Sequence, residues 1–344
     1  MTVYQRPSSG TIALTGRNIG RRVMHLATIA LALVVFTLPF AAEAQQARTV
    51  RIGYVYPTLL PHIVAFKQAV RDLGYVEGRH VMFEERAFGS SPPARVQEIL
   101  AALAPDMDLL VVWGTVAATA AKKVTTTLPT VFLSVGDPVA TGLVPNLARP
   151  GGNITGVTFE AAAETYGKRL QLLKETVPDL RRVAVLRPVG DPNAVVAVAS
   201  LEQAAQSLAV QLISVDVRSA KDLDPAFAEI KRKGAQGVMV VAGGFTVSNG
   251  QRIADLALAH RLPSAHVYIE TVAAGGLFSL GPALLEIART GAAYVDKILK
   301  GTKPGYLPVE QPTRYVLHVN LKTAKALGLT IPPSLLVRAD RVIE

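Results

Sequence analysis

The residues that could do chemistry in this sequence are spread singly along the chain and form no catalytic cluster. Its six histidines show neither the H-x-x-x-H nor the H-x-H spacing of metal sites. No nucleophile elbow, Walker loop or dinucleotide-binding glycine motif is present. The chain has no cysteine, which excludes disulfides, thiolate metal ligands and cysteine nucleophiles. We therefore expect no metal and no cofactor; an enzyme built from distant Asp and Arg residues is the less favoured alternative.

If the protein binds a ligand without changing it, the ends of the strands are the places to examine. Ligands of open α/β sheets collect at the carboxyl ends of parallel strands. In the first half of the chain the candidates at such positions are Tyr54, Tyr56, Phe88, Gly114, Thr115, Gly136 and Asp137. Gly114 lets a ligand approach the backbone and Thr115 offers a hydroxyl, although a plain helix cap is the alternative. Asp137 precedes a proline, so it either caps a turn or binds an ammonium group. Of Tyr54 and Tyr56, we expect one to belong to the core.

The corresponding strand ends in the second half carry both charges and rings. The candidates there are Arg187, Asp191, Phe245, Tyr268 and Glu270. Arg187 can clamp a carboxylate and Glu270 can bind an amine, although a solvated loop charge is the alternative for each. Phe245 either stacks on a ligand ring or fills the core. These residues and those of the first half are the predicted ligand-binding set.

The elements that must position these residues alternate between short apolar runs and segments of helical period. This alternation is typical of a parallel sheet with helical crossovers and predicts an α/β fold. The predicted strands span residues 50–56, 81–88, 109–113, 130–135, 183–186, 212–217, 238–241, 265–268, 277–280 and 315–319. Turn-forming residues at 148–153 interrupt the series, which then restarts. The two halves therefore follow one plan used twice.

The N-terminus has the pattern of an export signal. Arg17, Arg21 and Arg22 precede an apolar run over residues 23–42, and Ala42-Glu43-Ala44 then supplies small residues at a cleavage site. We expect cleavage after Ala44, so that residues 1–44 are a signal peptide. An uncleaved membrane anchor is the alternative, and the arginine pair can also indicate twin-arginine export. Without cysteine, a lipoprotein tether is excluded.

The charge pattern argues against nucleic acid. The 344-residue chain has a formal net charge of +10, but its basic residues are scattered rather than gathered with aromatic residues on one element. The densest group, at residues 231–233, lies at a predicted helix end, where cations suit the helix dipole. We expect no nucleic-acid partner.

Several stretches together resemble one family of proteins. They are Leu73–Gly78, Trp113–Thr115, Gly136–Val139, Leu147–Gly156, Tyr294–Gly301, Leu307–Thr313 and Asn320–Pro333. The chain resembles the ABC-transporter substrate-binding family, which includes tryptophan- and other aromatic-amino-acid-binding proteins of the type I periplasmic-binding-protein fold. The resemblance implies two Rossmann-like lobes with parallel sheets, joined by a three-crossover hinge, with the ligand in the cleft between them.

The resemblance also implies boundaries and partners, while the expected location follows from the N-terminal signal. Lobe 1 is expected to span 45–152 plus 277–306, and lobe 2 to span 153–276 plus 307–344. The expected protein is a periplasmic monomer that binds a small molecule, favoured to be an amino acid or small carboxylate, and delivers it to an ABC transporter permease. A ligand-binding sensor of the same fold is the alternative. An N-terminal helix-turn-helix would mark a cytoplasmic repressor of this fold, and the signal peptide occupies that place.

Overall fold

The computed structural model describes residues 1–3, 5, 48–160 and 164–344. The predicted signal peptide and its cleavage site after Ala44 fall almost entirely within 6–47 and so lie outside the described residues. Among the residues that are described, no helix has both the length and the apolar character required to cross a membrane.

The first sheet is wholly parallel and has five strands in the order β2-β1-β3-β4-β5. The strands are β1 (Val50–Tyr56), β2 (Val81–Ala87), β3 (Leu109–Trp113), β4 (Thr130–Val135) and β5 (Ile154–Thr158). All residues of β3, β4 and β5 are buried, as in a sheet that is covered by helices on both faces.

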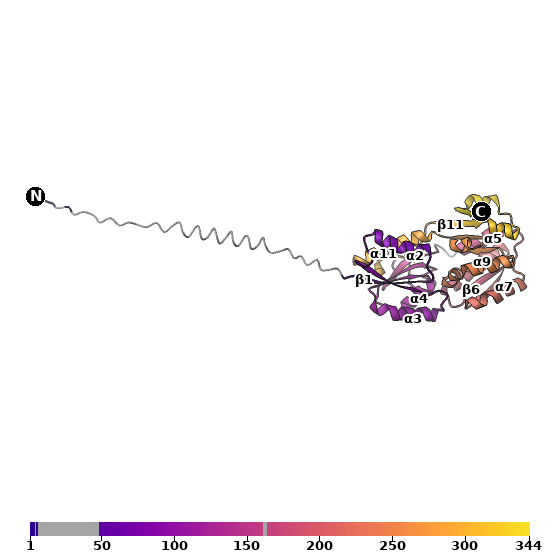
Figure 1. The fold of residues 1–344 in the computed structure, drawn as a ribbon, viewed down its shortest axis with the longest axis horizontal. Coiled ribbons are helices and arrows are strands. Elements are labelled where there is room, and N and C mark those ends of the chain that lie inside the picture. Colours follow the sequence, from indigo (N-terminus) through magenta and orange to yellow (C-terminus); the bar gives the residue numbers. More distant parts are fainter. Residues whose placement is uncertain (4, 6–47, 161–163) are drawn as a thin grey trace. The chain divides into compact units, whose positions relative to one another are not determined.

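Four helices cover this sheet. They are α2 (Pro61–Asp72), α3 (Pro93–Leu103), α4 (Thr115–Val124) and α11 (Leu284–Leu299), and a short 3₁₀ turn, η1 (Ala104–Asp106), follows α3. The helices α2 and α11 pack together on one face, while α3 and α4 pack on the other (Figure 1). The apolar spacing of Ile63, Phe66 and Val70 places all three side chains of α2 in the core. This sheet and these helices are called the first lobe below.

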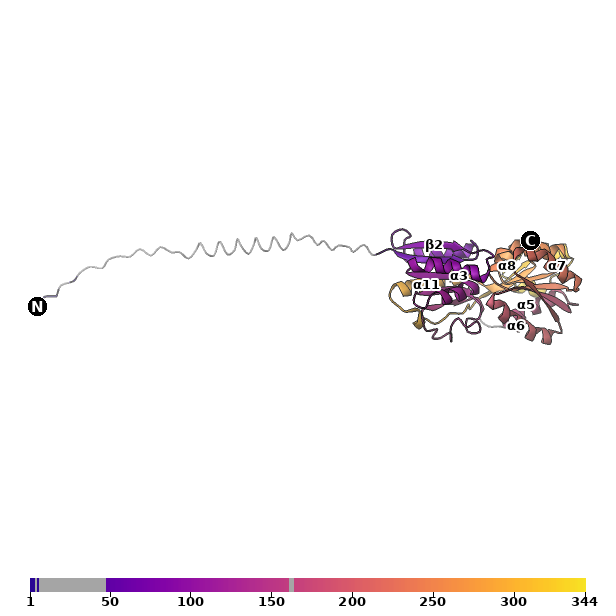
Figure 2. The same ribbon diagram turned by 90° about the horizontal axis from the view of Figure 1, so that it is seen from below.

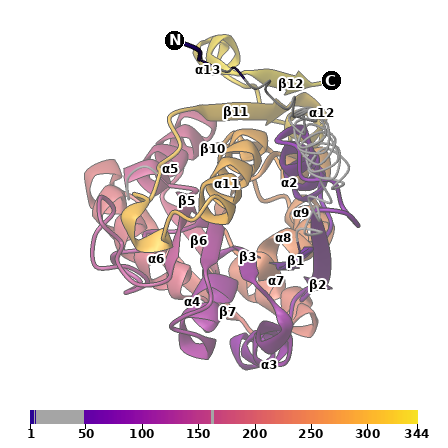
Figure 3. The same ribbon diagram turned by 90° about the vertical axis from the view of Figure 1, so that its left-hand side faces the viewer.

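The second sheet has seven strands in the order β12-β11-β10-β9-β8-β6-β7, and only the β10–β11 pair is antiparallel. The strands are β6 (Arg182–Pro188), β7 (Gln211–Val217), β8 (Gly237–Val240), β9 (Ser264–His266), β10 (Phe278–Pro282), β11 (Tyr315–Asn320) and β12 (Arg341–Ile343). The terminal strands β11 and β12 lie at one edge beside α13, as Figure 3 shows.

The helices of this second lobe cover both faces of its sheet. They are α5 (Glu164–Thr176), α6 (Pro192–Leu208), α7 (Leu223–Arg232), α8 (Gly244–Ser248), α9 (Gly250–Ala259), α10 (Ile269–Ala273), α12 (Leu321–Leu327) and α13 (Pro333–Arg338), with the 3₁₀ turn η2 (Ala220–Asp222). A further 3₁₀ turn, η3 (Pro304–Tyr306), lies against β5 of the first lobe. The pair α5 and α6 covers one face and α7 lies on the other (Figure 2).

Two strands lie in the other sheet from the one expected. The strand β5 was expected in the second lobe, but it pairs with β4 in the first sheet. The strand β10 was expected in the first lobe, but it pairs with β9 and β11 in the second. The glycines at 151–152 and 275–276 mark turns, whereas hydrogen-bond pairing decides which sheet each strand joins. The chain therefore crosses between the lobes after β5, between β10 and α11, and between α11 and β11.

Candidate functional site

A cavity lies between the two lobes. Its walls come from strand ends and helix starts of both sheets and from the first crossover. The lining residues are Pro57, His62, Trp113, Gly114, Thr115, Ser134, Phe159, Ala242, Gly243, Gly244, Val247, Tyr268 and Leu284. Because parallel strands place their carboxyl ends at one edge, both lobes contribute this edge to the cavity.

Trp113 forms one wall and is fixed in place by the core of the first lobe. It is the last residue of β3 and is only 2% exposed. Its indole N–H donates to the hydroxyl of Tyr54 (2.9 Å), which in turn donates to the carbonyl of Ile63 (3.0 Å). Both buried polar groups are thereby satisfied, so the indole presents a rigid aromatic surface.

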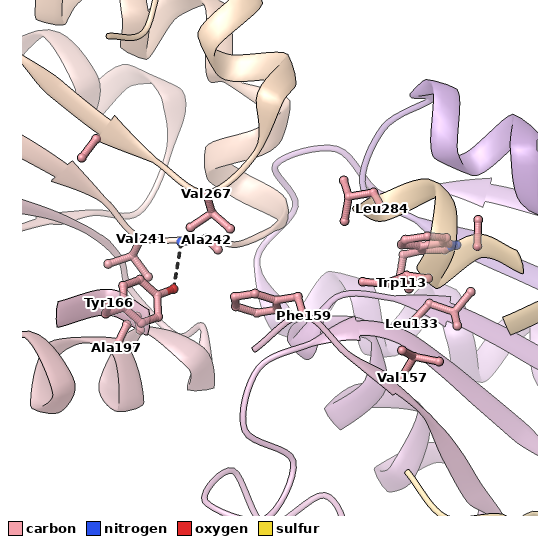
Figure 4. Close-up of a cluster of buried hydrophobic side chains, with 14 of the residues drawn as sticks. Trp113, Leu133, Val157, Phe159, Tyr166, Ala197, Val241, Ala242, Val267 and Leu284 are labelled. Atoms are coloured by element: carbon pink, nitrogen blue, oxygen red, sulfur yellow. Dashed lines mark hydrogen bonds between the residues drawn. The ribbon is translucent and has the colours of Figure 1, made fainter. Parts of the chain in front are cut away.

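Phe159 stands in the first crossover, directly after β5, and is 2% exposed. Figure 4 shows this ring between Trp113 and Leu284 on one side and Tyr166 and Ala242 on the other. Its centroid lies 6.3 Å from that of Tyr268 in a tilted arrangement favourable for aromatic pairs. Three rings from the first lobe, the crossover and the second lobe therefore line one cavity.

One set of polar groups in the cavity lies at the start of α4. Gly114 has a φ of +87°, which an L side chain rarely adopts, and it precedes the first helical residue, Thr115. The Thr115 hydroxyl accepts a hydrogen bond from the Gly136 N–H (3.0 Å) and does not cap its own helix. The N–H groups of the first turn have no partners within the helix, so they can receive an anionic group.

His62 and Glu270 are in contact across the lobes. The imidazole Nδ1 lies 3.3 Å from a carboxylate oxygen of Glu270, which is on α10. The ring is tilted against Trp113, with 4.7 Å between the ring centroids. Burial raises the pKa of Glu270, but the hydrogen bond and charge of His62 outweigh it, so the net pKa is below the ordinary value. The pair therefore favours contact between the lobes while Glu270 is ionised.

Other polar contacts also join the lobes around the cavity. Asn249 donates through its amide to the hydroxyl of Ser90 (2.7 Å), and Tyr268 is hydrogen-bonded to Ser134. Burial raises the pKa of Tyr268 well above its ordinary value, so this hydroxyl stays neutral. The two lobes are thus held together by groups at the rim and the wall of the cavity.

Several predicted ligand-binding residues come together here. Gly114, Thr115 and Tyr268 line the cavity itself. Gly136 lies behind Thr115, and Glu270 reaches the cavity through His62. Their contact with ligand stays a prediction.

The two tyrosines of β1 lie on the same face of the strand. Residues two apart on a strand point to the same face, so both rings pack together with centroids 5.1 Å apart. Tyr54 is fully buried in the core. Tyr56 directs its hydroxyl to Glu85 (2.7 Å), and both line a groove beside α2 rather than the cavity between the lobes.

Two charged candidates serve local structure. Asp137 accepts hydrogen bonds from the N–H groups of Val139 and Ala140, both at 2.9 Å, which is the turn-capping alternative. Arg187 forms a bidentate ion pair with Asp216 at the surface, with N–O distances of 2.7 and 3.0 Å. Neither residue lines the cavity.

The remaining three candidates, Phe88, Asp191 and Phe245, line a second cavity between the lobes. It adjoins the first one, since Gly244 lines both. A Cβ built at Gly244 would lie 2.8 Å from the Phe88 ring, so the lobes approach closely at this glycine. The cleft is therefore divided into two chambers, called the first and second cavity below.

Sequence reasoning did not select His62, Trp113, Ser134 or Phe159. Trp113 and Phe159 had a readable signal, because each directly ends or follows a buried strand. Ser134 lies inside β4 with a φ of +55°, and His62 lies in the first turn of a helix. For these two no local pattern distinguishes a cavity residue from any other. Among the described residues, no group of three or more His, Asp or Glu side chains is suitable for a metal ion.

Replacing Glu270 by glutamine should reduce stability at pH 6 by about 1–3 kcal/mol, because a charged hydrogen-bonding partner of His62 is lost. The folded pKa of Glu270 is lowered, so its contribution is present above the ordinary value of 4.5 and is lost as the pH falls below it. The melting temperatures of the two proteins should therefore converge on acidification. The control is Glu286→Gln in the exposed Arg314 pair. A difference for Glu270→Gln that persists unchanged at pH 3 would contradict this contact between His62 and Glu270.

Comparisons with known proteins agree on one family. Residues 55–343 match the family described as ABC transporter substrate binding protein. A curated relative, the tyrosine-binding protein of Clostridioides difficile (strain R20291), is 24% identical over 275 residues, which cover 80% of this chain and 78% of the relative.

Two solved structures have the same fold. A conserved domain protein from Vibrio cholerae O1 biovar El Tor aligns with a TM-score of 0.79 and 27% identity, covering 86% of this chain and all of that one. The ABC domain in complex with L-Trp from Streptococcus pneumonia aligns with a TM-score of 0.78 and 22% identity over the same shares.

Proposed function

The chain belongs to the family of ABC transporter substrate-binding proteins, and from this premise we propose that it is the extracytoplasmic solute-binding component of an ABC-type importer. The family consists of solute-binding proteins rather than enzymes. In this proposal residues 1–44 direct export, and the processed monomer captures a small molecule in the periplasm. It then delivers that molecule to a permease in the cytoplasmic membrane.

The cavity between the lobes is the observation that carries the proposal. It combines an aromatic surface of Trp113, Phe159 and Tyr268 with the N-terminus of α4 at Gly114 and Thr115. The aromatic rings of the cavity favour a ligand with an apolar or aromatic group. The unpaired N–H groups and the positive end of the helix dipole favour a ligand carboxylate. An amino acid or small aromatic carboxylate fits both demands. The relative from Clostridioides difficile is named as a tyrosine-binding protein, and tyrosine is a ligand of this class.

We propose that ligand binding selects a conformation in which the lobes are in contact. Three crossovers join the lobes, and a ligand that touches both of them stabilises the closed form by its differential affinity. The pairs His62–Glu270 and Ser90–Asn249 would then form as the lobes close. The closed surface is the signal that a permease can recognise.

The proposal is tested by thermal-shift screening of the protein against amino acids, aromatic acids, sugars and short peptides. A true ligand should stabilise by about 2.7 kcal/mol at a hundredfold excess over its dissociation constant. The expected hits are amino acids or small carboxylates. Stabilisation by sugars or peptides alone, or catalytic turnover of a hit, would contradict the proposed function.

Replacing Phe159 by leucine should weaken binding of an aromatic ligand about 2- to 10-fold, because the ring pairing is lost while the apolar volume is largely kept. Phe227→Leu is the matched control, since that ring is equally buried but lies on α7 in the second-lobe core. Both changes should lower the melting temperature, but only the first should change the affinity in calorimetry. Equal ligand affinities of the two variants would show that Phe159 does not contact the ligand.

A further inference from the structure

Exposed basic residues gather at one end of the second lobe, where the strands β6, β8 and β9 begin. They come from three segments, which are the start of β6, the end of α7 and the turn that follows α9. In the sequence only the run at 231–233 is apparent, because the other residues join it through the fold. The exposed cations of this group, called the basic end below, are Arg181, Arg182, Lys231, Arg232, Lys233 and Arg261.

Hydrogen bonds hold the three segments side by side. The side-chain oxygen of Gln236 accepts the N–H groups of both arginines at the start of β6, at 2.8 and 3.1 Å. The second of them, Arg182, donates from its guanidinium to the carbonyl of Gly234 (2.9 Å), directly after the basic run of α7. The N–H of Val238 donates to the carbonyl of Pro263 (2.9 Å), which joins the start of β8 to the turn after α9. The cations therefore lie at one surface rather than on three separate loops.

Few acids offset this charge. Within residues 178–182, 229–236 and 258–263 the acids are Asp179 and Glu229, and Glu229 lies 2.7 Å from Lys233. Cations suit the C-terminal ends of helices, but the fold does not require them there. In the first lobe α3 has no basic residue in its last turn and is followed by Asp106 and Asp108. Compensation of helix dipoles alone therefore does not account for the basic end.

The basic end is a surface rather than a pocket. None of its six cations lines the first or the second cavity, and the opposite ends of the same strands, which face the first cavity, are roughly 20 Å away. Leu258 on α9 is 36% exposed and its carbonyl accepts the N–H of Arg261 (3.0 Å), so an apolar side chain lies next to the cations. Long cationic side chains around an exposed leucine suit the phosphates and headgroup region of a lipid surface. The same three stretches contain no Phe, Tyr or Trp on which a nucleic-acid base could stack.

We propose that the basic end binds the anionic lipid surface of the cytoplasmic membrane and concentrates the protein there. Lysine and arginine side chains are attracted to anionic headgroups over about one Debye length. The cations lie at the strand starts and the first cavity at the strand ends, so a protein held in this way keeps its cavity accessible. The inference goes beyond solute binding and does not depend on which solute the protein binds. It relies on the proposed location only for which face of the membrane is met.

Sedimentation with lipid vesicles tests the proposal on the protein as the cell produces it. At low salt the wild type should sediment with vesicles of equal parts phosphatidylglycerol and phosphatidylcholine. It should stay in solution with vesicles of phosphatidylcholine alone. Raising the salt to about 0.5 M should release the protein, because the Debye length then falls to about 4 Å.

A triple variant tests the residues of the basic end. Combining Arg181→Gln, Lys231→Gln and Arg232→Gln should weaken binding to the anionic vesicles about 100-fold, since each cation near such a surface contributes roughly fivefold. Because these side chains are exposed, the melting temperature should change by no more than a few degrees.

The matched control removes the same types of residue from the first lobe. Arg79, Lys123 and Arg149 are exposed there, and their combined replacement by glutamine lowers the net charge by the same amount. This control should weaken vesicle binding less than about fivefold, because the basic end is intact.

The outcomes separate the basic end from other causes of binding. Salt-independent binding to phosphatidylcholine alone would show apolar insertion and overturn the proposal. Equal losses in the two triple variants would also overturn it, because net charge rather than the basic end would then govern binding. Retention by duplex DNA without retention by the anionic vesicles would assign another partner and overturn it as well. A failed thermal-shift screen would instead refute the proposed ligand class and leave the vesicle result unaffected.

Discussion

Replacing Arg169 by methionine is expected to lower the free energy of unfolding at pH 7 by about 3–5 kcal/mol, because a buried carboxylate loses its counter-charge. The Arg169 side chain is 1% exposed, and its guanidinium lies 2.7 Å from Glu160, which is 6% exposed. It also donates to the carbonyl of Leu280 (2.6 Å) and lies 4.6 Å from the ring centre of Tyr166.

These contacts tie together segments that lie next to the crossovers. Glu160 follows β5 in the first crossover, Leu280 is in β10 before the second, and Tyr315, at the end of the third, is hydrogen-bonded to Glu160. Burial raises the pKa of Glu160, while Arg169 opposes this shift. Without the arginine, Glu160 would protonate more readily, so the loss of stability should shrink as the pH falls from 7 to 5.

Urea unfolding measures the effect, and the chain offers its own controls. Arg338→Met breaks the exposed pair with Glu175 (3.1 Å) and should cost less than about 1 kcal/mol. Adding Glu160→Gln to Arg169→Met should recover part of the loss, because the uncompensated charge is removed. If Arg169→Met costs no more than Arg338→Met, the pair at the crossovers contributes nothing to stability.

Replacing Gly136 by alanine is expected to weaken ligand binding about 100-fold by keeping the lobes apart. A Cβ built at this glycine would lie 2.2 Å from the side-chain oxygen of Asn193 in the opposite lobe. Asn193 cannot easily yield, because its amide donates to the carbonyl of Ala242 (2.8 Å) and to the hydroxyl of Tyr166 (3.2 Å). Gly136 does not have a positive φ, so alanine fits the backbone of the first lobe.

This effect should therefore fall on closure rather than on folding. Scattering should show larger dimensions for Gly136→Ala than for the wild type at saturating ligand, while unfolding within each lobe is little changed. Adding Asn193→Ala removes the clashing oxygen and should restore much of the affinity. An affinity of Gly136→Ala equal to that of the wild type would mean that the observed contact between the lobes is not needed for binding.

The positions of the candidate residues in the structure show what local sequence patterns can predict. Gly114 and Thr115 were recognisable because a glycine and a hydroxyl follow a wholly buried strand. Their position at the cavity follows directly from that location. Arg187 occupies an equivalent strand end, yet it pairs with Asp216 on the neighbouring strand β7. A strand end brings a residue to the correct edge of the sheet, but its neighbours decide whether its side chain is available.

By itself the sequence determined the α/β class and the family. The class follows from local periodicity and the family from short motifs, and both can be identified in the sequence without knowing which segments are in contact. Only the tertiary structure decided which sheet β5 and β10 join, since strand pairing is a contact between distant segments. It alone also brought Trp113, Phe159 and Tyr268 around one cavity. These features depend on how the three crossovers bring two lobes face to face, and such long-range packing leaves no periodic trace in the chain.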